Sequence, residues 1–173
     1  DPISTKEFII PNAEEFTTHC ITLIHDTIWI GTNLGAGQII GDSIQWVYKN
    51  KFPNDHYGIK SICKDGQGNL WLGSYFQLYR FSPSAGQTDS FPLLQNMDIR
   101  DIQLIRNKIF IGTYGNGYFI YHDDQLIAMP KGRSLELSNT HTFIEDKDGY
   151  LWMSTNRGLY KTHMEAVEAF LKD

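Results

Sequence analysis

The sequence predicts an all-β protein made of four β-propeller blades, each a four-stranded antiparallel sheet, with a short helix at the C-terminus. Three observations support this class. A polar turn followed by a strand with a large aromatic residue occurs four times, with the aromatic at Trp29, Trp71, Phe110 and Trp152. The spacings between them are 42, 39 and 42 residues, a period typical of propeller arrays. Each copy also separates short β-favouring runs by turns that contain Gly, Asn or Asp.

The composition is that of an ordinary globular domain. The chain has 173 residues, of which 41% are hydrophobic and 20% charged, which is enough apolar content for a core. The net charge of −5 provides no basic surface, so nucleic acid is not an expected partner. No run approaches the roughly 18 apolar residues of a membrane span. Without a recognisable signal peptide, membrane contact is expected only through flanking segments absent from this sequence.

The second unit shows the strand order expected within a blade. Residues 59–64 form a β-rich run, and the turn at 65–68 contains two glycines that can adopt positive φ. Residues 70–74, 77–81 and 88–93 then form the second, third and outer strands. Four short antiparallel strands in about forty residues describe one blade.

The other units repeat this pattern with one systematic difference. The fourth unit matches the second position by position, whereas the first and third have a turn that is one residue shorter, at His25-Asp26 and Arg106-Asn107. The whole propeller segment is predicted over residues 1–163, with the four units at about 17–54, 55–97, 98–138 and 139–163.

The two ends of the chain carry separate predictions. The fourth unit ends after its third strand, and residues 5–10 could supply the missing outer strand, which would leave no unpaired sheet edge. The same ends would arise in a segment of a larger ring. Residues 164–173 predict a short helical stalk, because Met164, Val167, Phe170 and Leu171 fall on one helix face.

Several conspicuous residues have structural explanations. A blade buries both sheet faces against its neighbours, so the recurring aromatic is predicted to be a packing wedge. Cys20 and Cys63 form no metal-binding or CxxC spacing and are predicted to be buried free thiols. The stretch "DKDG" at 146–149 lacks the remaining ligands of a calcium loop, so an ordinary turn is predicted.

The repeated motif resembles a known family. "ICKDGQGNLWLGS" and "FIEDKDGYLWMSTNRGLYK" resemble the two-component regulator propeller repeat, and "IWIGTNLGAG" and "IFIGTYGNG" resemble weaker copies without the D-x-x-G turn. The resemblance implies the periplasmic sensor portion of a bacterial membrane receptor, such as a hybrid histidine kinase, a diguanylate cyclase or a transcription regulator. It also implies saccharide recognition in some members and rings that are commonly seven-bladed. Four units would then be part of a ring, a ring closed alone, or half of an eight-bladed dimer.

A ligand site is predicted at one end of the propeller channel. When the inner strands are aligned, one position near their start is basic in every unit: His19, Lys60, Arg100 and His141. Such a partial cationic ring would attract uronate or sulfate groups, more strongly at mildly acidic pH if the histidines take part. The alternative is that these residues pair with nearby carboxylates, such as Asp98 or Asp101.

Further candidates for this site lie in neighbouring loops. Aromatic rings, amides and an arginine suit a sugar, and the candidates of these types are Tyr57, Tyr75, Tyr114, Asn116, Asn156 and Arg157. Asn and Gly are also ordinary turn residues, so loop chemistry is a competing explanation. No catalytic residue, metal or other cofactor is expected.

Three functions are compatible with these patterns. The leading hypothesis is a non-enzymatic periplasmic sensor module that binds a small molecule or acidic oligosaccharide, with a homodimer as a further partnership. The second is a propeller lyase similar to virginiamycin lyases, with His19 or His141 as base beside a divalent metal. The third is an interaction platform whose blade surfaces only dimerise the receptor.

Overall fold

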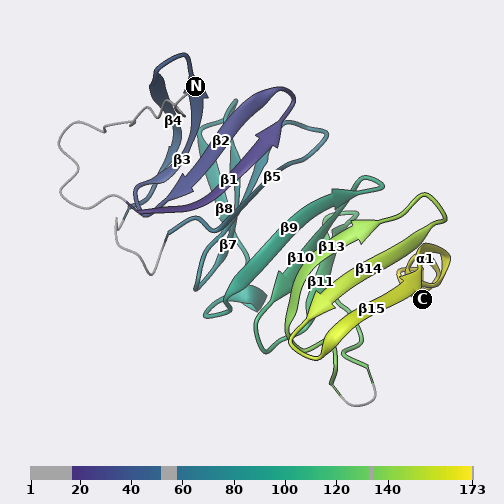
Figure 1. Cartoon of the computed structure of the whole chain (residues 1–173). Coiled ribbons are helices and arrows are strands. Elements are labelled where there is room, and N and C mark those ends of the chain that lie inside the picture. Colours follow the sequence, from purple (N-terminus) through teal and green to yellow (C-terminus); the bar gives the residue numbers. More distant parts are fainter. Residues whose placement is uncertain (1–16, 52–57, 133–134, 173) are drawn as a thin grey trace, which may run out of the picture.

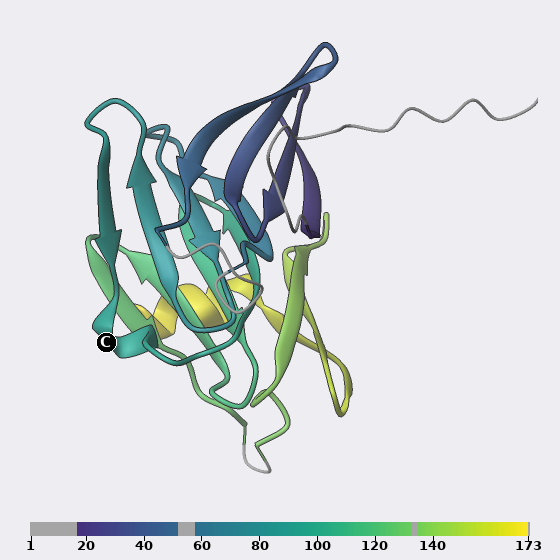
Figure 2. The same cartoon turned by 90° about the vertical axis from the view of Figure 1, so that its left-hand side faces the viewer.

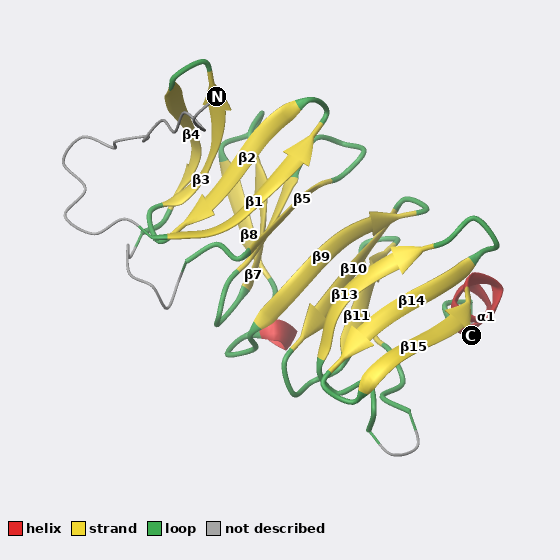
Figure 3. Ribbon diagram, in the orientation of Figure 1, coloured by secondary structure: helices red, strands yellow, loops and turns green. Residues whose placement is uncertain are grey.

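The computed structural model describes residues 17–51, 58–132 and 135–172, which form four successive antiparallel sheets (Figures 1 and 3). Three sheets have four strands and the last has three, and neighbouring strands in each sheet are consecutive in the chain. The predicted fold class is confirmed, including a fourth unit that ends after its third strand. The segment 5–10, predicted as its outer strand, lies outside the described residues.

Each sheet is one blade, and the blades are numbered here in chain order. Blade 1 contains β1 (Thr18–Ile24), β2 (Thr27–Thr32), β3 (Gly35–Ile40) and β4 (Ser43–Lys49). Blade 2 contains β5 (Ser61–Lys64), β6 (Leu70–Gly73), β7 (Leu78–Ser82) and β8 (Gln87–Ser90). Blade 3 contains β9 (Ile99–Ile105), β10 (Lys108–Thr113), β11 (Tyr118–His122) and β12 (Gln125–Ala128). Blade 4 contains β13 (Thr140–Glu145), β14 (Tyr150–Thr155) and β15 (Gly158–His163), followed by α1 (Met164–Phe170).

The blades follow one another in a row, and their inner strands are neighbours. β1 contacts β5, β5 contacts β9, and β9 contacts β13. An apolar cluster fills each of the three junctions: one around Trp29 between blades 1 and 2, one around Trp71 between blades 2 and 3, and one around Phe110 between blades 3 and 4. Within the part of the chain that the structure describes, no helix is long and apolar enough to cross a bilayer.

The recurring aromatic residue is confirmed as a packing wedge. Trp29, Trp71 and Phe110 are 3%, 1% and 0% exposed. Trp71 contacts Phe91 and Tyr121, with ring centroids 5.3 and 4.7 Å away. Trp152 is only half-buried, because none of the other described blades packs on its side of blade 4.

Turn chemistry accounts for the two hairpin lengths. The short turns are two-residue turns in which both residues have positive φ, as at His25 (46°) and Asp26 (62°) and at Arg106 (48°) and Asn107 (61°). This is the geometry of a type I′ turn, whose twist suits a hairpin. The longer turn at Asp65 needs only one residue with positive φ, Gly68 (89°).

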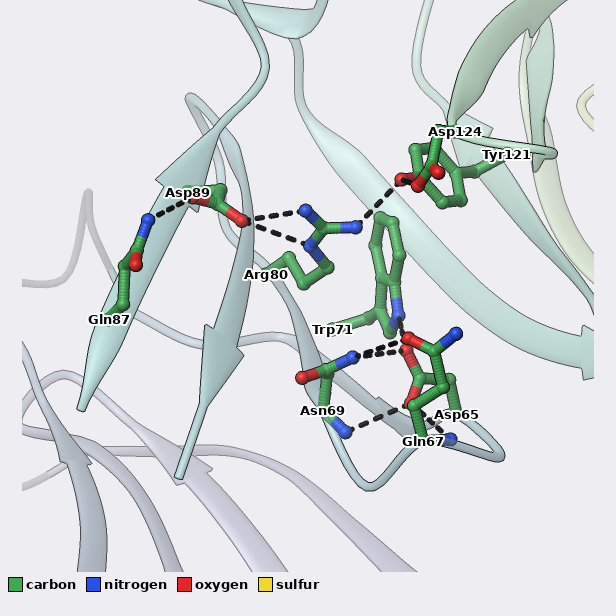
Figure 4. Close-up of polar contacts among 9 residues, drawn as sticks. All are labelled: Asp65, Gln67, Asn69, Trp71, Arg80, Gln87, Asp89, Tyr121 and Asp124. Atoms are coloured by element: carbon green, nitrogen blue, oxygen red, sulfur yellow. Dashed lines mark hydrogen bonds and ion pairs between the residues drawn. The ribbon is translucent and has the colours of Figure 1, made fainter. Parts of the chain in front are cut away.

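In the longer turns an aspartate joins the turn to the wedge. Asp65 accepts hydrogen bonds from the backbone N–H groups of Gln67 and Asn69 (both 2.9 Å) and from the indole Nε1–H of Trp71 (2.9 Å) (Figure 4). Asp146 does the same for Trp152, at 2.6 Å. The "DKDG" stretch therefore forms a turn, and the carboxylate of Asp146 accepts hydrogen bonds there. These hydrogen bonds lower the pKa of Asp146, and the one from Trp152 contributes most.

Two details differ from the sequence prediction. The outer strand of blade 2 ends at Ser90 rather than residue 93, because a 3-10 helix, η2 (Pro92–Leu94), begins with Pro92. In α1, the yellow helix of Figure 2, Met164 and Val167 pack into the cluster between blades 3 and 4, but Phe170 is 42% exposed.

The cysteines are free, as predicted. Cys63 is buried and Cys20 half-buried. Burial raises the pKa of Cys20 to about 11 and that of Cys63 to about 12. Both thiols therefore stay protonated, which makes them poor nucleophiles and poor metal ligands.

Candidate functional site

The candidate site lies at the end of the molecule where the turns between second and third strands meet the starts of the inner strands. Lys60 immediately precedes β5, and Arg100 is the second residue of β9. Tyr75 lies in the β6–β7 turn and Tyr114 in the equivalent β10–β11 turn. Because the blades are repeats, the two basic residues and the two tyrosines occupy matching places in blades 2 and 3.

One carboxylate joins the two basic residues. Lys60 Nζ lies 2.7 Å from Asp98 Oδ1, and Arg100 Nη2 lies 2.8 Å from Asp98 Oδ2. The carboxylate alternative considered for these residues is therefore correct for Asp98. Since two cations share a single anion, the group of three side chains keeps a formal charge of +1.

Each cation also lies over a tyrosine ring. Lys60 Nζ is 3.6 Å from the ring centroid of Tyr75, and Arg100 Cζ is 4.9 Å from that of Tyr114. Both distances suit a cation–π contact. The backbone N–H of Tyr114 donates to the carbonyl of Asp98 at 3.0 Å, which ties the tyrosine turn to the shared carboxylate.

The electrostatic setting leaves the cations incompletely compensated. Partial burial lowers the pKa of Lys60, although Asp98 acts in the opposite direction. Among the described residues, none accepts a hydrogen bond from the buried Nε–H of Arg100. Arg100 itself is one-third exposed. The guanidinium thus retains donor capacity beyond its contact with Asp98.

The predicted histidines lie on either side of this group. His19 meets the ring of Tyr75 edge-on, with centroids 6.3 Å apart, so it borders the Lys60 side. His141 Nε2 lies 2.6 Å from Asn156 Oδ1 within blade 4, which joins two of the predicted site residues to each other. The structure thus brings Lys60, Arg100, Tyr114 and His19 together through Asp98 and Tyr75, and it pairs His141 with Asn156 separately.

The remaining predicted residues have weaker connections to the site. Asn116 is half-buried and Arg157 exposed, each in a turn between the second and third strands of its blade. Tyr57 lies outside the described residues. Tyr75, which the sequence also offers as a loop candidate, contacts Lys60 in the same way as its repeat equivalent Tyr114 contacts Arg100.

A cavity of about 440 Å³ lies elsewhere, between blades 2 and 3 on the side of the Asp65 and Asp124 turns. Its polar groups are mutually engaged (Figure 4). Arg80 donates to Asp89 (2.8 and 3.1 Å) and to the hydroxyl of Tyr121 (2.7 Å), which donates to Asp124 (2.8 Å). The hydrogen bonds from Arg80 lower the pKa of Asp89. This network holds two blades together, so the cavity is a weaker ligand candidate than the Lys60–Arg100 group.

Metal chemistry finds no support in the described part of the chain. Among these residues, no group of three or more His, Cys, Asp or Glu side chains could hold a metal ion. A lyase site around His19 or His141 therefore has no metal-binding set beside it there.

Comparison with known families identifies the repeat. The model of the two-component regulator propeller family matches residues 52–76 and 134–157. These ranges lie mainly in the second and fourth units, in which the full motif was recognised. None of the curated proteins matches the chain significantly.

Solved structures with the same arrangement of blades include the extracellular domain of a putative one-component system from B. thetaiotaomicron. It has a TM-score of 0.69 and 21% identity over 84% of this chain and 21% of its own. The extracellular domain of a putative hybrid two-component system from the same organism has a TM-score of 0.66 and 20% identity, over 92% of this chain and 24% of its own.

Virginiamycin B lyase from Staphylococcus aureus is also similar, with a TM-score of 0.63 and 15% identity over 89% of this chain and 57% of its own. At these identities the likeness concerns the fold alone. The chain spans about a fifth to a quarter of the length of the two extracellular domains.

Proposed function

The chain is a β-propeller module with two-component regulator propeller repeats, and on that premise we propose that it senses an acidic saccharide or a similar anionic solute without turning it over. The observation that carries this proposal is the shared carboxylate: among the described residues, Lys60 and Arg100 form ion pairs with Asp98 alone. A ligand carboxylate or sulfate beside them would complete the charge balance.

The surrounding groups suit a sugar. Tyr75 and Tyr114 are 38% and 49% exposed, so their rings present apolar surface on which the C–H face of a pyranose could pack. Arg100 would supply paired N–H donors to a carboxylate, a geometry that Lys60 cannot offer. The two tyrosines and the two cations therefore supply the two kinds of contact that a uronic acid needs.

The family resemblance supports the signalling context. The solved relatives with this fold include extracellular domains of putative one-component and hybrid two-component systems. We propose that this module likewise lies outside the cytoplasmic membrane and that the output chemistry belongs to another part of the receptor.

The test is calorimetric titration of the chain with an oligogalacturonate and with a neutral galactan oligomer of the same length. We expect saturable binding of the acidic oligomer and none of the neutral one. Arg100→Ala should weaken binding roughly 10- to 100-fold, because it removes charge-assisted hydrogen bonds of about 1.5–3 kcal/mol. Lys147→Ala removes a cation from the turn at the opposite end of blade 4 and should leave binding unchanged.

Binding should also weaken as salt is added, since Arg100 is partly exposed and salt screens its attraction to an anionic ligand. If no acidic glycan gives a binding signal at millimolar concentration, the proposal is contradicted. Equal binding of the neutral oligomer, or equal effects of Arg100→Ala and Lys147→Ala, would contradict the assignment of the site.

A further inference from the structure

The first blade exposes apolar side chains on the sheet face that no other described blade covers. Ile21 and Leu23 of β1 and Ile28 of β2 are 70%, 66% and 42% exposed. Leu23 and Ile28 are cross-strand partners. We call these three residues the N-terminal open face.

The positions equivalent to Ile21 and Ile28 are buried in every later blade, whereas those equivalent to Leu23 are half-buried or exposed: Lys64, Leu104 and Glu145. Ile21 pairs with the second strand as Ile62, Ile102 and Phe143 do in blades 2, 3 and 4. Those three are 6%, 2% and 2% exposed, because each packs against the preceding blade. The positions equivalent to Ile28 are at most 3% exposed; they are Leu70, Ile109 and Leu151.

The last blade shows the complementary pattern on its opposite face. Ile144 and Leu159 are 63% and 65% exposed, and Trp152 lies half-buried between them in the sheet. We call these three residues the C-terminal open face. The positions equivalent to Leu159 in the first three blades are at most 4% exposed; they are Ala36, Leu78 and Tyr118.

The three internal junctions all follow one rule. In each, the sheet face that carries the Trp or Phe wedge packs on the next blade, on the face that carries the residue equivalent to Ile21. The C-terminal open face carries a wedge, Trp152. The N-terminal open face carries Ile21. A single chain therefore carries both halves of one more junction.

We propose that these two faces bind each other between two copies of the chain. Each copy would place its C-terminal open face on the N-terminal open face of the other, in a head-to-tail pair with two equivalent junctions. A head-to-tail interface forms a ring when its rotation closes. Two copies of the four described blades give eight, within the four to eight of known propellers, and three copies would exceed that range.

Charge complements the apolar match. Lys161 lies opposite Trp152 in the sheet as Arg80 lies opposite Trp71. Arg80 reaches across the internal junction to Tyr121, which donates to Asp124 in the following turn. The position equivalent to Asp124 in blade 1 is Asp42, in the β3–β4 turn. In the proposed pair, Lys161 of one copy faces Asp42 of the other.

One position makes the proposed junction looser than the internal ones. Gly31 and Gly112 lie against backbone of the next blade, where an added Cβ would come within 2.3 Å of the Ile59 carbonyl and 2.5 Å of the Thr140 carbonyl. The equivalent residue of blade 4 is Ser154. Its side chain keeps the two copies further apart, so the pair should dissociate on dilution, whereas the internal junctions are held in one chain.

The experiment is sedimentation velocity of the intact chain over a concentration series, with single variants of each open face. We expect the mass to rise from 19.9 kDa to twice that value and to stop there. Ile21→Lys blocks one face and Leu159→Asp the other, and each variant alone should weaken pairing about 100-fold or more, as truncation of buried interface residues does. Leu93→Asp changes an exposed leucine of η2 away from both faces and should pair normally.

Mixing Ile21→Lys with Leu159→Asp tests whether the two copies pair head to tail. One variant keeps only its C-terminal open face and the other only its N-terminal open face, so the mixture should form a mixed pair through a single junction. Ser154→Gly should tighten the unmodified pair. Asp42→Lys and Lys161→Glu should each weaken it, and the double variant should recover the association.

Circular dichroism of each variant checks that the sheets remain folded. A chain that stays monomeric up to about millimolar concentration would overturn the proposal. So would pairing of Leu159→Asp with itself, because that result requires two identical faces to meet.

Discussion

At the scale of the residue, two tryptophans that make the same hydrogen bond differ in burial because they lie at different places in the row of blades. Trp71 and Trp152 occupy the same place in the repeat, and both donate an indole hydrogen bond to the aspartate of the preceding turn. Trp71 is 1% exposed between two blades, whereas Trp152 is half-buried at the end of the row. The hydrogen bond is common to both, so the buried apolar area is what distinguishes them.

Replacing each tryptophan by alanine should separate these contributions. Trp71→Ala should lower the free energy of unfolding by about 3–5 kcal/mol, because it leaves a cavity among buried rings. Trp152→Ala should cost about half as much in the monomer, because much of its side chain already contacts water. Urea unfolding at low protein concentration measures both values. Equal losses would show that the hydrogen bond, rather than burial, determines the effect.

At the scale of the element, the first and second strands of the blades are joined by two different types of turn. Blades 2 and 4 have a longer turn in which one glycine adopts positive φ and the aspartate carboxylate accepts backbone N–H groups. Blades 1 and 3 have a two-residue turn in which both residues adopt positive φ without a glycine. This conformation costs energy for residues with a Cβ, although Asn and Asp tolerate it.

Residues 25 and 26 therefore offer a stabilising change. His25→Asn with Asp26→Gly is the preferred pair for a type I′ turn and should raise the free energy of unfolding by about 1 kcal/mol, judged from the left-handed penalty. Urea unfolding again provides the measurement. Asp148→Gly is the control, because residue 148 has no positive φ and should gain nothing. A loss of stability in the double variant would contradict the turn assignment.

At the scale of the whole molecule, stability rests on contacts between consecutive blades. Gly112 lies where blade 3 approaches blade 4, and a Cβ there would meet the Thr140 carbonyl at 2.5 Å and the ring of Phe143 at 3.2 Å. Since nothing but adjacent blades holds such an array together, separating one junction weakens both blades that share it.

Gly112→Ala should therefore cost about 1–3 kcal/mol, as overpacking in a core does. The matched control is Gly66→Ala in the β5–β6 turn, where nothing lies within 4 Å of the added Cβ and the change should stay within about 0.5 kcal/mol. Thermal unfolding followed by circular dichroism compares the two variants. If both lower the melting temperature equally, close blade approach does not limit stability.

The repeat made much of the fold predictable. A forty-residue period with a wedge after each polar turn specifies blades, because each sheet must cover both faces with its neighbours, and this holds whatever the loops do. The strand ends were less predictable: Pro92 ends the outer strand of blade 2 early, and α1 buries Met164 and Val167 but not Phe170. Such boundaries depend on local contacts and on single residues such as Pro92, which the repeat period does not reveal.

The candidate site was predictable in kind and less so in detail. The repeat places Lys60 and Arg100 at equivalent positions, and nearby carboxylates were expected as their partners. The repeat did not show that Asp98 forms an ion pair with both of them. Nor did it show that Tyr75 lies under Lys60, or that His141 turns to Asn156. These pairings depend on side-chain directions across turns and between blades.

The sequence by itself determined the blades, their order and their buried wedges, because these follow from periodic burial along the chain. Only the tertiary structure decided which charges share a partner and which apolar faces remain uncovered. Both depend on the distance between residues about forty positions apart, such as Lys60 and Asp98. Periodicity shows which positions are equivalent, but the packing of one blade on the next sets how far apart they lie.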